Sequence, residues 1–196
     1  MRKLTYFVAT TVDGFIAGPQ GQWDFLVTEG VTLRAQAEEL PETLPQHARR
    51  AMGLSDTPAR FDTVVMGRAT YEPGLSAGFP HPYAPLRTVV FSRTLPSKEE
   101  GSLRITSDDP VATVRALKRE ESPNGLGIWL CGGGKLAAVL ADEIDELVVK
   151  LNPRLTLGEG IRLFEGRFSP RNLTLRGHRT FDSGVIWLTY DLLPPR

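Results

Sequence analysis

The sequence predicts one α/β domain, in which a mainly parallel β-sheet carries helices on both faces and ends in a C-terminal antiparallel hairpin. Short β-rich runs alternate with helical patterns along most of the chain, which is typical of a sheet covered by helices. The C-terminal part has alternating strands without a comparable helix between the last two. No linker, repeat or low-complexity tract divides the chain, so we expect residues 1–196 to form a single domain.

Strands in the first part of the chain are expected at residues 4–11, 63–66, 88–91 and 127–131. The opening "MRKLTYFVATTVDG" alternates and has no small-residue cleavage site, which favours a strand over a signal peptide. The C-terminal strands are expected in "DELVVKL", "RNLTLRGHRTF" and "SGVIWLTYDLL". The Pro/Gly-rich segment 73–85 is expected to be a long loop, and segment 18–30 another.

Helices are expected between these strands. Residues 31–40 are helical in composition. In "SDDPVATVRALKREE", Asp108 or Asp109 is the expected N-cap and Pro110 lies in the first turn. The apolar face of that helix is formed by Val111, Val114 and Leu117. A further buried stripe is expected from Leu136, Val139 and Leu140.

The composition excludes several classes of function. With 41% hydrophobic and 23% charged residues, the chain matches ordinary soluble proteins, and no apolar run approaches a membrane span. Since 23 basic residues balance 23 acidic ones and no basic stretch stands out, we expect neither a nucleic acid nor a membrane as partner. The single cysteine, Cys131, excludes an internal disulfide and fits the reducing cytoplasm.

An apolar run stops at Gly132, Gly133 and Gly134, and Lys135 follows. A phosphate-binding P-loop would need a glycine at 129 and a hydroxyl at 136, and both are missing. The pattern G-x-G-x-x-A is present, but it comes too late in the chain for a conventional dinucleotide-binding fold. Two explanations of the three glycines remain open. The glycines form a plain strand-to-helix turn, or their bare backbone lets the amides and Lys135 face a bound anion.

Two further strand ends carry similar groups. In "FDTVVMGRATYE" an apolar strand leads to Gly67, Arg68 and Thr70, although Arg68 alone would also suit a solvated surface. In "RTVVFSRTLP" a strand ends in polar side chains that suit a phosphate: Ser92, Arg93 and Thr94. Because ligands of open α/β sheets bind at the carboxyl ends of strands, these segments together suit a ligand with several phosphates.

The chain resembles the dihydrofolate reductase-like family through "FVATTVDGFIAG", "VMGRATYE", "VVFSRTL", "CGGGKLAAVL" and "DELVVKLNPRLTLGEGIRLFEG". It is most similar to the branch that contains the C-terminal reductase domain of the bifunctional riboflavin-biosynthesis deaminase-reductase and its stand-alone relatives. The resemblance covers nearly the whole chain in the family's order. It implies a dihydrofolate reductase-like fold, NADPH as cofactor, a small-molecule substrate and a homodimer.

The resemblance also implies which residues meet the cofactor. Ala9 and Ile16 would border the nicotinamide, beside a mobile loop at residues 18–23. The phosphates and the rest of the cofactor would be contacted by Gly67, Arg68, Thr70, Ser92, Arg93, Thr94, Gly132, Gly133, Gly134, Lys135 and Leu136. A pteridine- or pyrimidine-like heterocycle is the implied substrate.

The chain departs from the family at its acidic residues. Dihydrofolate reductases carry a carboxylate at the start of the helix after the mobile loop, and the corresponding position here is about Thr28. The nearby Glu29 and Asp24 are therefore the candidate proton donors. Either could instead be an exposed loop carboxylate or a helix cap. The riboflavin-pathway glutamate before the glycines is Cys131 here, which also suits a small core residue. Trp23 is expected either to stack on the substrate or to fill the core.

Two alternatives remain beside a reductase. One is a nucleotide-binding protein of the same fold without turnover, because the family carboxylates are missing. The other is a serine esterase, since "GLSAG" matches G-x-S-x-G around Ser76, with His81 and His178 as conceivable bases. That motif requires a strand, a tight turn and a helix, whereas Ser76 leads into "FPHPYAP". The histidines show no paired metal-ligand spacing.

Overall fold

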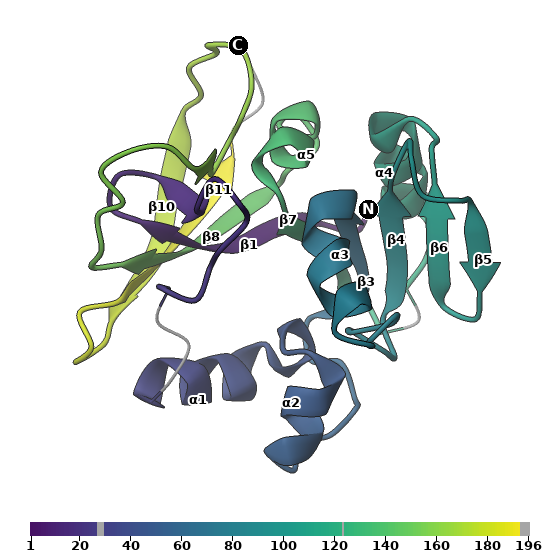
Figure 1. The fold of residues 1–196 in the computed structure, drawn as a ribbon, viewed down its shortest axis with the longest axis horizontal. Coiled ribbons are helices and arrows are strands. Elements are labelled where there is room, and N and C mark those ends of the chain that lie inside the picture. Colours follow the sequence, from purple (N-terminus) through teal and green to yellow (C-terminus); the bar gives the residue numbers. More distant parts are fainter. Residues whose placement is uncertain (27–29, 123, 193–196) are drawn as a thin grey trace.

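The computed structural model describes residues 1–26, 30–122 and 124–192. Its main feature is a nine-stranded sheet with the order β10-β11-β8-β1-β7-β3-β4-β6-β5 (Figure 1). The strands are β1 (Leu4–Thr11), β3 (Phe61–Gly67), β4 (Arg87–Phe91), β5 (Lys98–Glu100), β6 (Leu103–Thr106), β7 (Gly127–Gly132), β8 (Glu146–Asn152), β10 (Leu173–Thr180) and β11 (Ile186–Leu192). A separate two-stranded sheet pairs β2 (Phe15–Ala17) with β9 (Ile161–Arg162).

The centre of the large sheet is parallel, from β8 through β1, β7, β3 and β4 to β6. The C-terminal hairpin β10–β11 joins β8 in antiparallel fashion at one edge, as the sequence predicts. A second antiparallel pair, β5–β6, closes the other edge and was not predicted. Its edge strand Lys98–Glu100 is fully exposed and charged, and therefore carries no apolar alternation.

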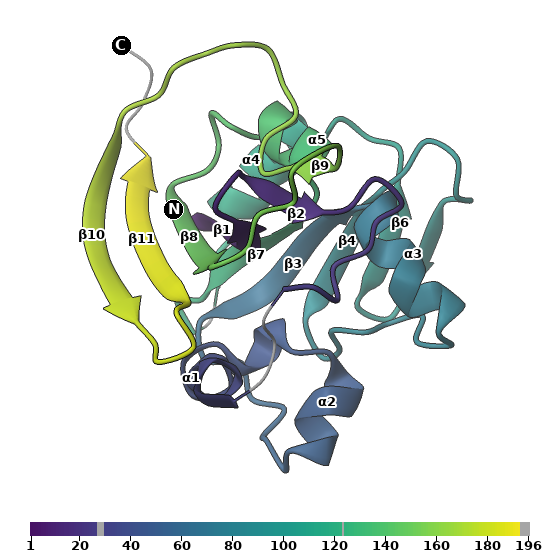
Figure 2. The same cartoon turned by 60° about the vertical axis from the view of Figure 1, so that its left-hand side comes forward.

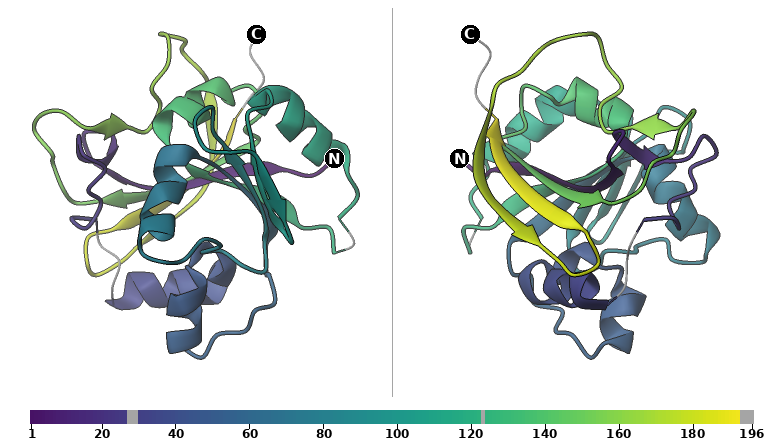
Figure 3. Two further views of the ribbon diagram at one scale, coloured as in Figure 1. Left: turned by 45° about the vertical axis from the view of Figure 1, so that its right-hand side comes forward. Right: turned by 90° about the vertical axis from the view of Figure 1, so that its left-hand side faces the viewer.

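Helices cover both faces of the sheet, as predicted (Figures 2 and 3). They are α1 (Gly30–Glu39), η1 (Pro41–Thr43), α2 (Gln46–Ala51), α3 (Arg68–Ser76), α4 (Pro110–Arg119) and α5 (Gly134–Val139). One core cluster lies between the sheet and α4 and α5, and contains Val114 and Leu117. The other lies on the opposite face, where α1 and α3 contribute Ala35 and Tyr71. In the described ranges no helix has the length and apolarity needed to cross a membrane.

Local signals explain where some helices begin. Asp109 is the N-cap of α4, with its carboxylate accepting a hydrogen bond of 2.7 Å from the amide of Ala112, and Pro110 is the first helical residue. Two expectations were wrong. Val139 is 55% exposed, whereas Leu136 and Leu140 are buried as expected. Segment 73–85 is not all loop, because α3 continues through Pro73 to Ser76 and is anchored by the buried Tyr71.

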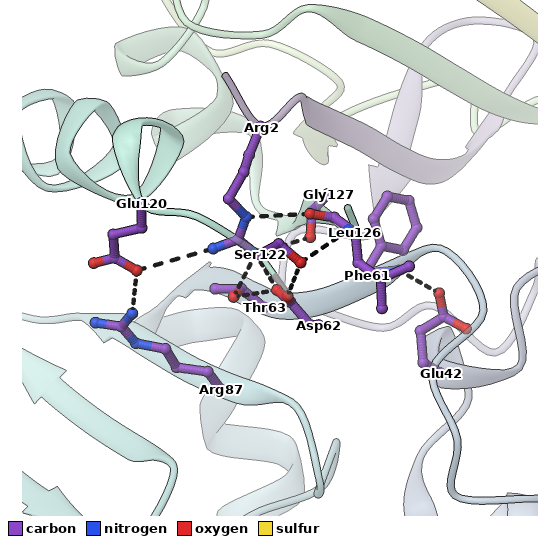
Figure 4. A network of polar contacts seen from close by, with 10 residues as sticks. All are labelled: Arg2, Glu42, Phe61, Asp62, Thr63, Arg87, Glu120, Ser122, Leu126 and Gly127. Carbon is purple, nitrogen blue, oxygen red and sulfur yellow. Dashed lines mark hydrogen bonds and ion pairs between the residues drawn. The ribbon is translucent and has the colours of Figure 1, made fainter. Parts of the chain in front are cut away.

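Paired charges hold the amino ends of the central strands together (Figure 4). The Arg2 guanidinium lies against the carboxylate of Asp62 and donates to the hydroxyl of Thr63 at 2.9 Å and to the carbonyl of Gly127 at 3.2 Å. Glu42, which is fully buried, accepts from the amide of Phe61 at 2.7 Å. Since these groups satisfy one another, the opposite, carboxyl edge is where polar groups remain for a ligand.

Candidate functional site

The carboxyl ends of β3, β4 and β7 lie side by side. In the parallel register Gly67 of β3 is opposite Phe91 of β4, and Met66 is opposite Gly132 of β7. Ser92 follows β4 and Gly133 follows β7, so these residues leave the two strands that flank β3. The segments that the sequence singles out meet at one edge of the sheet.

The first turn of α3 connects the other two loops. The hydroxyl oxygen of Thr70 lies 3.6 Å from the position that a Cβ atom on Gly132 would take, and 3.7 Å from that on Gly133. Arg68 donates from Nη1 to the hydroxyl of Thr94 at 2.9 Å. The half-exposed Arg68 also pairs with Glu72 at 3.5 Å, so part of its guanidinium remains for a ligand.

The three glycines have different structural roles. Gly132 has φ +134°, a conformation that residues with a Cβ rarely adopt. At Gly134 a Cβ would overlap the carbonyl oxygen of Arg162, and its own carbonyl accepts from the Glu165 amide at 3.0 Å. Gly133 has neither constraint, and only Thr70 is near its missing Cβ. The bare backbone at Gly133 is therefore the part of the run that packing does not explain.

Two cations near these loops have no partner among the described residues. Arg93 and Lys135 are exposed, and no described residue forms an ion pair or hydrogen bond with either side chain. The six residues of α5 make it too short to be an anion site by its dipole, which leaves Lys135 as the cationic group there.

Ser92 is committed in part to its own loop. This residue is buried, and its hydroxyl oxygen accepts from the amides of Thr94 at 3.2 Å and Leu95 at 2.9 Å. A hydroxyl that accepts in this way still has one proton to donate. Ser92 can therefore meet a phosphate only as a donor.

The remaining cofactor candidates are apolar. Ala9 lies half-buried near the carboxyl end of β1, and Ile16 of β2 packs against the core on the α5 side. Leu136 is 8% exposed and its side chain belongs to the same core, so only its backbone can approach a ligand.

The candidate proton donors are placed only in part. Asp24 is exposed in the loop before α1. Glu29 and the neighbouring Thr28 lie outside the described residues. Trp23 is 55% exposed, so it does not fill the core and is accessible for stacking.

Cys131 faces an aromatic neighbourhood. Its Sγ is 3.8 Å from the hydroxyl of Tyr83, whose ring packs edge-on against Trp129 at 4.9 Å. Burial raises the pKa of the Cys131 thiol to about 12, so the sulfur stays protonated at neutral pH. A protonated, buried thiol suits the small core residue that the sequence analysis offers.

A buried lysine that the sequence analysis did not single out lies beside Ala9. Lys150 of β8 is opposite Ala9 of β1 and is only 4% exposed. Burial lowers the pKa of its ammonium to about 8. The available signal was the lysine inside the apolar strand "ELVVKLN", where alternation puts it on the same face as the buried Val148.

A cavity of about 340 Å³ lies elsewhere, between β4, β6 and α4. Its charges are already paired, Arg87 with Glu120 at 2.6 Å and Arg104 with Asp108 at 2.6 Å. We therefore place the candidate site at the strand ends and not in this cavity.

The esterase geometry does not occur at Ser76. Ser76 is the last residue of α3 and not the turn between a strand and a helix. The imidazole of His81 contacts the hydroxyl of Thr88 at 3.1 Å, and His178 lies on the edge strand β10. Within the described ranges, no group of three His, Cys, Asp or Glu side chains is arranged to hold a metal ion.

A mainly parallel sheet with its uncovered polar groups at the carboxyl edge and an antiparallel C-terminal hairpin is the architecture of the dihydrofolate reductase class. Dihydrofolate reductase from Enterococcus faecalis complexed with NADP(H) superimposes with a TM-score of 0.59 at 15% identity, over 97% of this chain and 96% of that one. A protein from Shewanella sp. PV-4, named as a putative riboflavin biosynthesis protein, superimposes with a TM-score of 0.67 at 23% identity. The superposition covers 98% of this chain and 99% of that one.

The RibD C-terminal domain model matches residues 2–187, so the chain belongs to that family. It is also 28% identical over 186 residues to the uncharacterized protein YwjB of Bacillus subtilis (strain 168), covering 94% of this chain and 95% of YwjB. The family assignment and the fold agree with the resemblance seen in the sequence.

Proposed function

We propose that this chain is an NADPH-dependent reductase that transfers a hydride to a small nitrogen heterocycle, pteridine- or pyrimidine-like, or to a related compound. The observation that carries the proposal is the meeting of the loops after β3, β4 and β7, with partnerless cations beside a bare glycine backbone. The RibD C-terminal domain family and the fold of an NADP(H)-binding dihydrofolate reductase support it.

The donor groups present at the strand ends fit a ligand that carries several phosphates. We propose that the pyrophosphate is held by Gly67, Arg68 and Thr70. The 2′-phosphate is proposed to be held by Arg93 and by the hydroxyl proton of Ser92. Guanidinium groups and hydroxyls form charge-assisted hydrogen bonds to phosphate oxygens. The wider set that we propose to surround the cofactor includes Thr94, Gly132, Gly133, Gly134, Lys135 and Leu136.

Bound NADPH supplies the hydride. The chain's part is to orient the nicotinamide, proposed to lie against Ala9 and Ile16, and to deliver a proton to the reduced nitrogen. Asp24 and Glu29 are the proposed donors, and Trp23 and Cys131 the proposed substrate contacts. An acid placed within hydrogen-bond reach of the nitrogen is sufficient for that step.

The cofactor assignment is tested by titration. We expect NADPH to quench tryptophan fluorescence saturably. Arg93→Ala should weaken NADPH binding about ten-fold or more, because one charge-assisted contact to the 2′-phosphate is lost. NADH has no 2′-phosphate, so the effect on NADH binding should be much smaller. Arg50→Ala, which removes an exposed arginine on α2, is the matched control and should change neither. Equal weakening of both cofactors would show that Arg93 does not read the 2′-phosphate.

Turnover is tested separately, by following NADPH oxidation with a panel of pterins, pyrimidines and small imines and carbonyls. Oxidation with any of them supports a reductase. Saturable NADPH binding without oxidation on the whole panel would favour the nucleotide-binding alternative.

We also propose a cytoplasmic homodimer. Exposed apolar side chains on β10 and the segment before it support an interface, namely Leu157, Phe168 and Leu175 at 83%, 96% and 51% exposure. Light scattering should give twice the 21.6 kDa of one chain, and Phe168→Glu should reduce it to one. A wild-type mass of 21.6 kDa would refute the dimer.

A further inference from the structure

Lys150 differs from the other buried lysine of the described chain. Lys118 is 5% exposed, and its ammonium pairs with Asp145 at 2.8 Å and donates to the carbonyl of Glu143 at 2.9 Å. Lys150 is 4% exposed, yet no described residue offers its ammonium an ion pair, a hydrogen bond or an aromatic face. A buried charge without a partner is costly, and such groups gather at functional sites.

The position of Lys150 places it in the proposed site. It lies two residues before the end of β8, and the register puts it between Ala9 of β1 and Trp187 of β11. Residues opposite one another in a sheet share a face, and here it is the face where Phe7 and Trp187 pack.

The neighbouring Trp187 adds a second hydrogen-bond donor. Its indole Nε1 is buried and has no acceptor in the part of the chain that the structure describes. The nearest carboxylate along β8, Glu146, is already engaged by Arg60 and by the hydroxyl of Thr5 at 2.9 Å. Lys150 and Trp187 therefore form a pair of adjacent residues with donors only.

The ammonium of Lys150 is not completely enclosed. The completely buried, unpaired side-chain nitrogens of the described chain belong to Arg49 and Trp187, and Nζ of Lys150 is not one of them. The side chain is 4% exposed as a whole, so its stem is enclosed and the exposure that remains is small. With a pKa of about 8 the group is mostly cationic at neutral pH.

We propose that Lys150 is the specificity-determining residue of the site and binds an anionic oxygen, such as a carboxylate, carried by the planar substrate. This inference rests on the proposed function, because Ala9 is the residue assigned to the nicotinamide. A neutral substrate would cover the ammonium without pairing it, which disfavours that ligand. An anionic oxygen supplies the missing acceptor, so the site selects acidic heterocycles over neutral ones.

Orotate and uracil test this selection, since they are the same flat pyrimidine with and without a carboxylate. By calorimetry on the full chain, with and without NADPH, we expect orotate to bind the wild type at least about ten-fold more tightly than uracil, the usual range for a charge-assisted contact. Lys150→Met should abolish the preference and Lys150→Arg should keep part of it. Lys3→Met, an exposed lysine at the other end of β1, should leave it intact.

Equal affinity of the wild type for both compounds, including no binding of either, would overturn the inference, and so would a preference that survives Lys150→Met. Circular dichroism on each variant confirms folding. As a second measurement, the ¹³Cε resonance of Lys150 should titrate below the ordinary lysine range and move toward it when orotate binds. A resonance that orotate leaves unchanged would also refute contact.

The outcomes separate this inference from the proposed function. Orotate selection through Lys150 without any NADPH binding would retain the inference about Lys150 and refute the reductase. NADPH binding and oxidation with no orotate preference would retain the reductase and refute only the role of Lys150.

Discussion

Replacing Lys150 by methionine should stabilise the protein at neutral pH. Methionine keeps an unbranched stem of similar length, so the enclosed part of the side chain stays packed and only the ammonium is removed. The described structure gives this ammonium no partner. The substitution therefore removes an unfavourable charge without leaving another group unsatisfied.

The size of the gain follows from the pKa. In the folded chain the pKa of Lys150 is lowered from 10.5 to about 8 by burial, and each pH unit corresponds to about 1.4 kcal/mol, which gives about 3 kcal/mol. Because the folded pKa lies below the unfolded one, the penalty is complete below about pH 8 and vanishes as the pH rises above the unfolded value. At about pH 10 less than about 1 kcal/mol should remain.

Urea unfolding of the wild type and Lys150→Met at about pH 7 and about pH 10 measures this difference. We expect the variant to be more stable at the lower pH, with an advantage that shrinks at the higher one. Lys118→Met is the matched control, because it removes an equally buried lysine that has partners. Its loss removes the donor to the Glu143 carbonyl and the cation beside Asp145, whose carboxylate keeps the hydrogen bond from the Leu4 amide. That variant should lose stability. A loss for Lys150→Met as well, or a gain that does not depend on pH, would refute the description of Lys150 as unpaired.

Further predictions concern packing and reactivity. Gly134→Ala should lower the unfolding free energy, measured by urea titration, by at least about 1 kcal/mol, because its Cβ would meet the Arg162 carbonyl. Gly158→Ala is the control and should have little effect, because its Cβ would meet nothing within 4 Å. The Cys131 thiol, with its pKa raised from 9.0 to about 12, should react with iodoacetamide at about pH 8 roughly a thousand-fold more slowly than a free thiol, and at the free rate in urea. Arg2→Ala should cost about 2 kcal/mol in urea unfolding, because the Asp62 carboxylate loses its cation and keeps the hydrogen bonds from Thr63 and Ser122. An unchanged midpoint would contradict the network in Figure 4.

The parts of the fold that local patterns determine could be predicted from the sequence. The strand Leu4–Thr11 and the cap at Asp109 occur where periodicity and capping residues put them. The strand Lys98–Glu100 could not be predicted, since an exposed edge strand of charged residues has no apolar face. Val139 was misplaced on the buried stripe, because only Leu136 and Leu140, which are four residues apart, face the core.

The candidate site was predictable to the extent that topology determines it. Parallel strands send their carboxyl ends to one edge, so Gly67, Ser92 and Gly132 had to approach one another once their strands were neighbours. The distinct reasons for the three glycines were not predictable, because the contact between Gly134 and Arg162 joins distant parts of the chain. Lys150 carried a signal in the apolar strand "ELVVKLN", but its lack of a partner in the described chain depends on contacts that the sequence does not show.

Lys118 and Lys150 show why burial must be read together with partners. Both lysines are buried, yet one pairs with a carboxylate and a carbonyl while the other has no partner in the described chain. Replacing a structural lysine should destabilise the protein. Replacing a lysine that is kept for a ligand should stabilise the protein and weaken ligand binding. The two measurements on Lys150→Met, unfolding and orotate preference, are therefore expected to move in opposite directions, and a purely structural role for Lys150 cannot produce that combination.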